Sequence, residues 1–547
     1  MKVDSFAVAA ALIASSIPSV TATGGNNFTR RCGRLIQTFK NPNTKVLSSG
    51  YVTKGTNVTY PDIHPTCGQG WIVAQADMCR LSLNVTTSST SNIIMEVWLP
   101  ENWKSSGQRF AMTGNGGVGG CLTLSDLAFT TSLGFATVGH NNGHDGLSSL
   151  PFLNKPEVVR DFAWRATLVA TQVGKAATNF FYQSSLAKSY YIGCSGGGRQ
   201  GMKIAQDFPE EYDGIIAGDP AADFHRLVAG GLYYSYQTGP PTAATWLSLE
   251  QWKAVDAEVL AQCDTIDGVE DTVLEDPLRC NPRFETMLCG QLETWATHQC
   301  LTPAQVSAVE KIYSPVYGNK GRFVAPRFQP GNDQNLGFYL IYGSPSELGV
   351  EYLRYAIKND ASWNLPPTLD EFLDIMDDLL DNDPIGVSAN NPNLTPLKNS
   401  GHKLLVYHGE SDGYYSHENT LRLYEATARN MTLKAKQLDD FYRLFPISGL
   451  NHCGGGNGAW FFGASGQNGL GISGVDPNES LIMKMVSWVE NGIAPETLRG
   501  YQVNPLTGRL EGAIRDHCRH PLKNTYKGVG DPLAPENWEC KLGTKYP

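Results

Sequence analysis

Short apolar runs alternate with amphipathic stretches through the first half of the chain. Buried strands are predicted at the apolar runs of residues 109–113, 135–138, 189–192 and 214–217. Residues 158–181 carry apolar side chains at helical spacing, and a second helical stretch covers residues 199–208, ending before Pro209. Strands that alternate with helices in this way indicate a parallel sheet covered by helices.

The pattern changes after about residue 222. Cysteines, Pro-rich loops and amphipathic helices such as residues 304–313 follow for a length far beyond an ordinary strand-to-helix connection of about 2–6 residues. Strands are predicted again at residues 403–407 and 442–445, and a late helix at residues 481–490. We therefore expect residues 223–396 to form an inserted lid domain, and residues 23–222 and 397–547 to form one catalytic α/β domain.

The first residues have the pattern of a signal peptide. Lys2 precedes an apolar stretch at residues 6–17, and Val20-Thr21-Ala22 places suitable residues at a cleavage site near Ala22. The apolar stretch is shorter than the roughly 20 residues that span a bilayer, and no later segment reaches that length without charges. We expect residues 1–22 to be removed and the mature protein to be secreted, with no membrane segment.

Composition agrees with export and argues against a nucleic-acid partner. The formal net charge is -10, and no cluster of Lys and Arg suited to phosphate binding is present. Twelve cysteines, an even number, indicate a disulfide framework in an exported chain. Glycosylation sequons lie at Asn27, Asn57, Asn84, Asn393, Asn430 and Asn478, the one at Asn393 being weaker because Pro396 follows it.

A G-x-S-x-G sequence at residues 193–197 contains a candidate nucleophile, Ser195. The predicted strand before it and the predicted helix after it match the turn that exposes a nucleophilic serine in α/β-hydrolases. A Gly-rich turn without chemical function is the alternative, and the flanking elements make it less favoured.

Chain order selects the other members of a catalytic triad. In α/β-hydrolases the acid and then the histidine follow the serine, on loops after later strands. Asp412 follows the predicted strand at residues 403–407, with Glu410 as a neighbouring alternative, and His452 follows the strand at residues 442–445. His140 and His144 are rival bases, but both precede Ser195.

Cys194 precedes the candidate nucleophile, and Cys453 follows the candidate base. If Ser195 and His452 are within hydrogen-bonding reach, these cysteines are close enough to form a disulfide, which requires Cα atoms within about 7 Å. Such a bond would hold the two catalytic loops in register. Pairing of each cysteine elsewhere stays open, because connectivity cannot be deduced from sequence alone.

The chain resembles the fungal and bacterial tannase and feruloyl esterase family over nearly its whole mature length. The matching segments are residues 161–166, 193–200, 208–214, 408–412, 449–456 and 488–492. The resemblance implies an α/β-hydrolase fold with a large inserted lid, Ser195, Asp412 and His452 as triad, and a Cys194–Cys453 disulfide.

The same resemblance implies an oxyanion hole, a calcium site and further disulfides. One oxyanion donor would be the amide of Gly196, and the other that of Gly117, with Gly116 nearly as suitable. A structural Ca²⁺ in the lid would bind Asp264, Asp267 and Asp271 with the carbonyls of Val269 and Val273, and a solvated acidic loop is the alternative. The implied disulfides are 32–79, 67–121, 263–280, 289–300 and 518–540.

The family's substrates are esters of phenolic acids. We expect a secreted carboxylesterase that hydrolyses feruloyl or other hydroxycinnamoyl esters through an acyl-enzyme on Ser195, with a tannase acting on galloyl esters as the alternative. A catalytically inactive carbohydrate-binding relative is the alternative of another class. Phe224 and Tyr415 are candidate substrate-binding residues. We expect catalysis without a cofactor, and a monomer or a homodimer.

Overall fold

The computed structural model describes residues 27–290, 299–331, 344–468, 472 and 476–543. The predicted signal peptide, residues 1–22, lies outside these residues.

A nine-stranded sheet forms the centre of the described residues, in the order β1-β4-β5-β7-β6-β8-β9-β12-β13. Its strands are β1 (Thr44–Val52), β4 (Met78–Thr86), β5 (Asn92–Pro100), β6 (Arg109–Thr113), β7 (Ala136–His140), β8 (Lys188–Cys194), β9 (Gly214–Gly218), β12 (Lys403–Gly409) and β13 (Tyr442–Ile447). The strands from β7 to β13 run parallel, while β1, β4 and β5 pair antiparallel. The carboxyl ends of the parallel strands therefore meet at one edge of the sheet.

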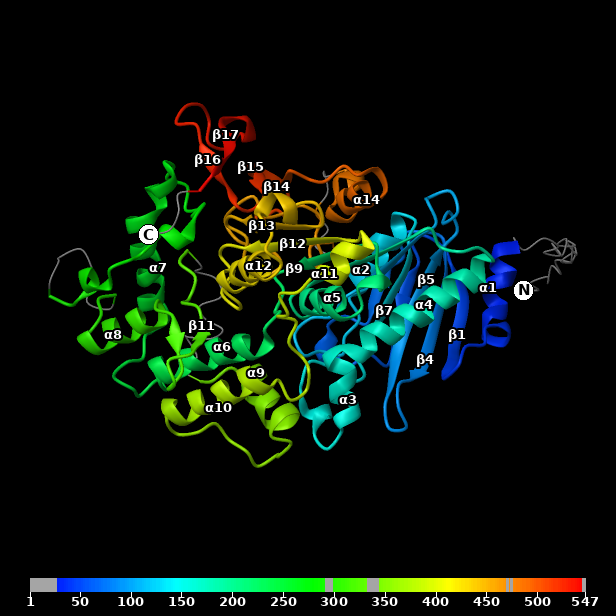
Figure 1. Ribbon diagram of the computed structural model, residues 1–547, viewed down its shortest axis with the longest axis horizontal. Coiled ribbons are helices and arrows are strands. Elements are labelled where there is room, and N and C mark those ends of the chain that lie inside the picture. The colour runs from blue at the N-terminus through cyan, green and yellow to red at the C-terminus, as the bar shows by residue number, and fades with distance from the viewer. Residues whose placement is uncertain (1–26, 291–298, 332–343, 469–471, 473–475, 544–547) are drawn as a thin grey trace, which may run out of the picture.

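Helices cover both faces of the sheet (Figure 1). The α-helices are α1 (Asn27–Thr38), α2 (Leu124–Ser132), α3 (Pro156–Arg160), α4 (Ala166–Tyr182), α5 (Gly196–Asp207), α6 (Phe224–Thr238), α7 (Leu249–Cys263), α8 (Pro303–Ile312), α9 (Glu347–Glu351), α10 (Leu369–Asn382), α11 (Thr395–Ser400), α12 (Glu418–Asn430), α13 (Ala435–Leu438) and α14 (Leu481–Asn491). Successive side chains of β8 point to opposite faces of the sheet, so they belong to two separate parts of the core. Tyr191 packs with α4 and α5, whereas Tyr190 and Ile192 pack with α14.

The predicted strands and helices of the sheet are confirmed, with two differences. The three antiparallel strands β1, β4 and β5 were not predicted. The single helix predicted over residues 158–181 is interrupted by a π-helical turn at Asp161–Arg165. Asp161 in that turn is buried and accepts hydrogen bonds from Thr87 and Arg165, so tertiary contacts to the β4–β5 connection accompany the irregular turn.

The segment between β9 and β12 has an apolar core largely of its own, which includes Trp252, Phe284 and Tyr313. Its helices α6 to α10 lie at the end of the molecule opposite α1 and β1 (Figure 1). Small two-stranded sheets complete the described chain: β2 (Asn57–Thr59) with β3 (Trp71–Val73), β10 (Val316–Tyr317) with β11 (Phe323–Ala325), β14 (Thr497–Val503) with β15 (Leu510–Cys518), and β16 (Leu522–Tyr526) with β17 (Trp538–Leu542). One apolar cluster joins the inserted helices to residues near Val118 and Phe162, which ties the insertion to the catalytic edge.

Candidate active site

Ser195 lies at the sharp turn between β8 and α5. Its backbone has φ +61° and ψ −119°, a strained conformation for a residue with a side chain. The turn packs too closely for other side chains: a Cβ on Gly198 would lie 2.2 Å from the carbonyl oxygen of Gly218, and one on Gly193 would lie 2.8 Å from the carbonyl of Gly197. Close packing therefore requires glycine at these positions around Ser195. The strained turn presents the Ser195 hydroxyl at the carboxyl edge of the sheet.

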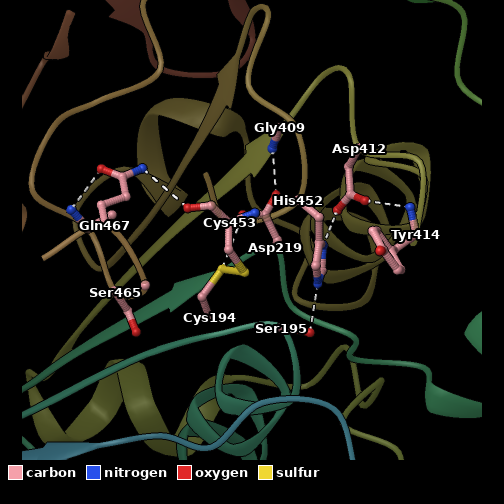
Figure 2. Close-up of a disulfide and its surroundings, with 12 residues drawn as sticks. Cys194, Ser195, Asp219, Gly409, Asp412, Tyr414, His452, Cys453, Ser465 and Gln467 are labelled. Carbon is pink, nitrogen blue, oxygen red and sulfur yellow. Dashed lines mark hydrogen bonds and ion pairs between the residues drawn. A yellow bond between two sulfur atoms is a disulfide. The ribbon is translucent and has the colours of Figure 1, made fainter. Parts of the chain in front are cut away.

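The structure brings Ser195, His452 and Asp412 into one hydrogen-bonded chain (Figure 2). The distance from Ser195 Oγ to His452 Nε2 is 2.7 Å, and the distance from His452 Nδ1 to Asp412 Oδ2 is also 2.7 Å. The Asp412 side chain is fully buried, whereas that of His452 is 16% exposed. The ring can thus accept the serine proton on one nitrogen while the carboxylate holds the other N–H.

The pKa shifts of Asp412 and His452 support these two roles. Burial alone would raise the pKa of Asp412, but the charge of His452 and hydrogen bonds from His408 and His452 outweigh it and hold that pKa well below its ordinary value. Burial alone would lower the pKa of His452, but Asp412 outweighs it, so the pKa of His452 is raised. The pair therefore keeps a charged carboxylate that stabilises an imidazolium.

All six disulfides that the sequence analysis predicted are confirmed. Cys194 and Cys453 have Cα atoms 6.0 Å apart and join loops separated by 259 residues (Figure 2). Cys453 has φ +63°, in the left-handed region, so the loop that carries His452 includes a strained residue fastened by this bond.

The predicted oxyanion donors lie against each other. Gly196 contributes the first amide of α5, which has no carbonyl partner within the helix, and a Cβ there would lie 3.0 Å from the amide nitrogen of Gly117. Asn115 fixes the opposing turn, because its amide donates to Gln200 Oε1 at 3.0 Å and its side chain accepts from Gln200 at 2.9 Å. Gly117 has φ +55°, which suits glycine. The site thus has amides and a helix N-terminus beside the serine, suited to a developing negative charge.

The rival residues occupy other environments. His140 and His144 are buried, and burial lowers the pKa of both, that of His140 to about 3. Glu410 is also buried, and its Oε1 lies 3.2 Å from Lys523 Nζ. The hydrogen-bonding partner of His452 is Asp412, so the structure favours Asp412 over Glu410 as the acid.

The two weak substrate-binding candidates lie in the core. Phe224 is 1% exposed and packs on Phe162 and Tyr352. Tyr415 is 3% exposed, and its hydroxyl accepts the amide hydrogen of Asp223. Both positions correct the sequence-based expectation, because a side chain enclosed in the core offers little surface to a substrate.

Tyr414, next to Tyr415, lies at the site instead. It is half-buried, and its ring centre is 5.1 Å from that of His452. A second apolar group reaches the site from the insertion, because a Cβ on Gly117 would lie 3.8 Å from Leu348 Cδ1 in α9. Adjacent residues in a loop do not reveal from sequence which one faces inward, and Tyr415 is the buried one of this pair.

Sequence reasoning also missed two polar residues. His408, at the end of β12, lies with Nε2 3.2 Å from Asp412 Oδ2. Asp219 follows β9 directly, is fully buried, and accepts hydrogen bonds from the amides of Gly409 and Cys453. The position of Asp219 after a predicted strand next to the nucleophile's strand was a signal that could have found it.

The predicted calcium loop follows α7 and carries its three carboxylates in a partly buried setting. Each accepts a backbone amide within the loop: Asp264 from Thr272, Asp267 from Val269, and Asp271 from Val273. Burial, with smaller contributions from neighbouring carboxylates, raises the pKa of Asp267 to about 7 and that of Asp271 to about 6.

Asp264 Oδ1 is buried without a hydrogen-bonding partner, and burial raises the pKa of Asp264 as well. Within the described residues, the oxygens of the three aspartates do not converge to within 4.8 Å of one another. The donor chemistry and the electrostatics of the loop therefore fit a hard cation, and the arrangement found is looser than a closed cage.

Known proteins resemble this chain over most of its length. The family model described as tannase and feruloyl esterase matches residues 79–345 and 359–541. A probable feruloyl esterase B-2 of Aspergillus terreus is 41% identical over 514 residues, which are 94% of this chain and 95% of that protein. The crystal structure of feruloyl esterase B from Aspergillus oryzae has a TM-score of 0.88 and 39% identity, covering 94% of this chain and all of that one. A tannin acyl hydrolase from Aspergillus niger shares the fold, with a TM-score of 0.73 and 21% identity over 94% of this chain and 95% of that one.

Proposed function

The chain belongs to the tannase and feruloyl esterase family of carboxylic ester hydrolases, and from that premise we propose that it is a secreted serine esterase acting on hydroxycinnamoyl esters. One observation carries the chemistry: the continuous chain from Ser195 Oγ through His452 to buried Asp412, with two distances of 2.7 Å. A serine that donates to a histidine oriented by a carboxylate is an activated nucleophile.

The reaction proceeds in two halves. Ser195 Oγ attacks the ester carbonyl carbon while its proton passes to His452 Nε2, and the amides of Gly196 and Gly117 receive the oxyanion. His452 then returns the proton to the alcohol oxygen as the carbon–oxygen bond breaks, which leaves the acyl group on Ser195. Water repeats the sequence against the acyl-enzyme, releases the acid, and restores the serine.

A phenolic acyl group suits the surroundings of His452. Tyr414 offers an aromatic face beside the imidazole, and Leu348 adds an apolar contact next to the oxyanion turn. A flat ring with few polar groups is recognised by such surfaces. The relatives named feruloyl esterase B are about twice as similar in sequence as the tannin acyl hydrolase, which favours hydroxycinnamates over gallates.

A substrate panel tests this choice. Purified protein is assayed on methyl ferulate, chlorogenate, methyl gallate and tannic acid, with Ser195→Ala as the matched inactive variant. We expect hydrolysis of the first two and none by the variant. Strong release of gallate with none of ferulate would favour the tannase alternative. If an activated phosphonate does not modify Ser195, the inactive carbohydrate-binding alternative is favoured.

The same proposal includes export and glycosylation. Six disulfides support an oxidising compartment, and none of the described helices is long and apolar enough to cross a membrane. Five of the six sequon asparagines are exposed and the sixth, Asn84, is half-buried. Mass spectrometry of protein from a fungal secretory host, before and after endoglycosidase, reads both the mature N-terminus and the occupied sites.

We further propose that the loop at residues 264–273 binds a structural Ca²⁺. Asp264, Asp267 and Asp271 would hold it, with the carbonyls of Val269 and Val273, and the ion would neutralise carboxylates that burial now penalises. The Cys263–Cys280 disulfide closes this loop. The proposed ion would act on stability, because no step of the ester chemistry requires a metal.

A further inference from the structure

Asp219 touches both loops that complete the active site. It lies directly after β9, which runs between the nucleophile's strand β8 and the acid's strand β12. Its Oδ1 accepts the amide hydrogen of Gly409 at 2.7 Å, and its Oδ2 accepts that of Cys453 at 3.1 Å (Figure 2). One carboxylate therefore links the loop leading to Asp412 with the loop that carries His452.

The backbone at Asp219 is tied to the remaining parts of the site. The amide of Ser195 donates to the carbonyl oxygen of Gly218 at 2.9 Å, and the amide of Asp219 donates to that of Tyr407 at 2.9 Å. Asp219 has φ +36°, in the left-handed region that side chains disfavour. A strained residue at the meeting point of three catalytic segments suggests a functional constraint on its side chain.

The carboxylate is also part of the electrostatic environment of the base. The charged and titratable groups that face it are His408, with Nε2 3.8 Å from Oδ1, together with Asp412, His452 and Tyr407. Asp219, Asp412 and His452 each place a side-chain atom within 4.8 Å of the other two. Burial raises the pKa of Asp219, and the charge of Asp219 contributes to the raised pKa of His452.

We propose that Asp219 is a positioning residue of the esterase site, which holds the His452 loop by its contact with the Cys453 amide and supplies a second negative charge behind the imidazolium. The proposal rests on the proposed serine-esterase function. When the proton of Ser195 moves to His452, the imidazolium faces Asp412 directly and Asp219 at longer range. Asp219 exchanges no proton with substrate and forms no bond to it.

Asp219→Asn tests both parts of this role. The amide group offers one acceptor oxygen where the carboxylate offers two, so one of the two backbone amides loses its partner, and the negative charge disappears. The readout is the rate at which an activated phosphonate labels Ser195, measured across pH, because it depends on the Ser195–His452 pair and not on the substrate. The labelling rate falls at low pH as His452 becomes protonated, and this part of the profile is its acid limb. Without the charge of Asp219 the pKa of His452 falls, so we expect the acid limb to move down by about 1 pH unit, the low end of the effect of a charge within 4–6 Å. We also expect the plateau rate to fall roughly 10-fold as the base becomes misplaced.

Asp161→Asn is the matched control. Asp161 is equally buried and hydrogen-bonded, but its partners, Thr87 and Arg165, belong to other parts of the fold. That variant should lose thermal stability while its acid limb stays in place. An acid limb of Asp219→Asn that coincides with the wild type's, in a variant that melts cooperatively, overturns the proposal. If Asp219→Asn does not fold, Asp219→Ser, a smaller residue that keeps one acceptor, is measured with the same expectations.

The readout also separates this proposal from the proposed function. If phosphonate labels the wild-type protein but the protein hydrolyses no ester of the panel, the substrate assignment is refuted. The labelling rates of wild type and Asp219→Asn still test the role of Asp219 in that case. Wild-type protein that phosphonate does not label would refute the serine nucleophile, and the role of Asp219 falls with it.

Discussion

Removal of the Cys194–Cys453 disulfide separates its contribution to catalysis from its contribution to stability. We predict that Cys194→Ala with Cys453→Ala folds but loses kcat about 10- to 100-fold, because a displacement of about 1 Å at the base costs that much. The loop of His452 keeps other anchors in this variant: Asp219 still accepts the amide of residue 453, and Gln467 still donates to its carbonyl at 3.3 Å. Activity should therefore fall without vanishing.

The stability cost follows from the length of the closed loop. With a sequence separation of 259 residues, chain entropy gives about 5.5 kcal/mol as the upper figure for this crosslink. The Cys518–Cys540 disulfide closes 22 residues, for which the same relation gives about 3 kcal/mol. Both variants should therefore be visibly destabilised, and only the first loses a crosslink that lies beside the nucleophile and the base.

The assay compares these two double variants with wild type on methyl ferulate, at a temperature where circular dichroism shows all three folded. Melting curves give the stability change, and kcat is measured separately from KM. Cys518→Ala with Cys540→Ala should lower the melting temperature and leave kcat near that of wild type. Equal kcat in the Cys194/Cys453 variant and wild type would refute the reasoning, and so would an equal loss of kcat in both variants.

Three further outcomes are expected. Asp412→Asn should lower kcat by about 10⁴ in a variant that still melts cooperatively, because an amide does not hold the His452 tautomer; a loss below tenfold would argue against the assignment of the acid. Gly196→Ala should lower kcat sharply with a smaller change in KM, since its Cβ would lie 2.5 Å from the carbonyl oxygen of Gly117 and displace the oxyanion turn. A chelator should lower the melting temperature more at about pH 8 than at about pH 5, as differential scanning fluorimetry would show. The reason is that Asp267 and Asp271 have folded pKa values, about 7 and 6, above that of a free carboxyl, so the metal-free fold loses stability as pH rises through this range, and bound Ca²⁺ offsets the loss. An identical melting curve with and without chelator, in protein shown to hold no metal, would rule the calcium site out.

The order of elements along the chain was sufficient to identify the central features of the site. Apolar runs marked the strands that flank the serine, and each chemical residue of the predicted triad followed a predicted strand. Parallel strands bring their carboxyl ends to one edge, so residues distant in sequence were expected to meet. This is why Ser195, Asp412 and His452 could be proposed together and are found in hydrogen-bonding contact.

Local sequence was a poor guide where facing directions decided the outcome. Tyr414 and Tyr415 are adjacent, and only the packed fold turns one toward His452 and the other into the core. The antiparallel strands β1, β4 and β5 were not predicted from the sequence. The π-helical turn at Asp161–Arg165 accompanies contacts to another part of the sheet, which no helical periodicity records.

The sequence by itself determined the chemistry of this protein: a serine in a Gly-rich turn, a later acid, a later histidine, and cysteines placed to join them. Only the tertiary structure decided how that chemistry is held in position. Asp219 became visible as a common anchor because its two oxygens reach amides 190 and 234 residues away in the chain. Side-chain contacts of that kind arise from the packing of neighbouring strands, and a linear sequence does not specify which atoms will meet.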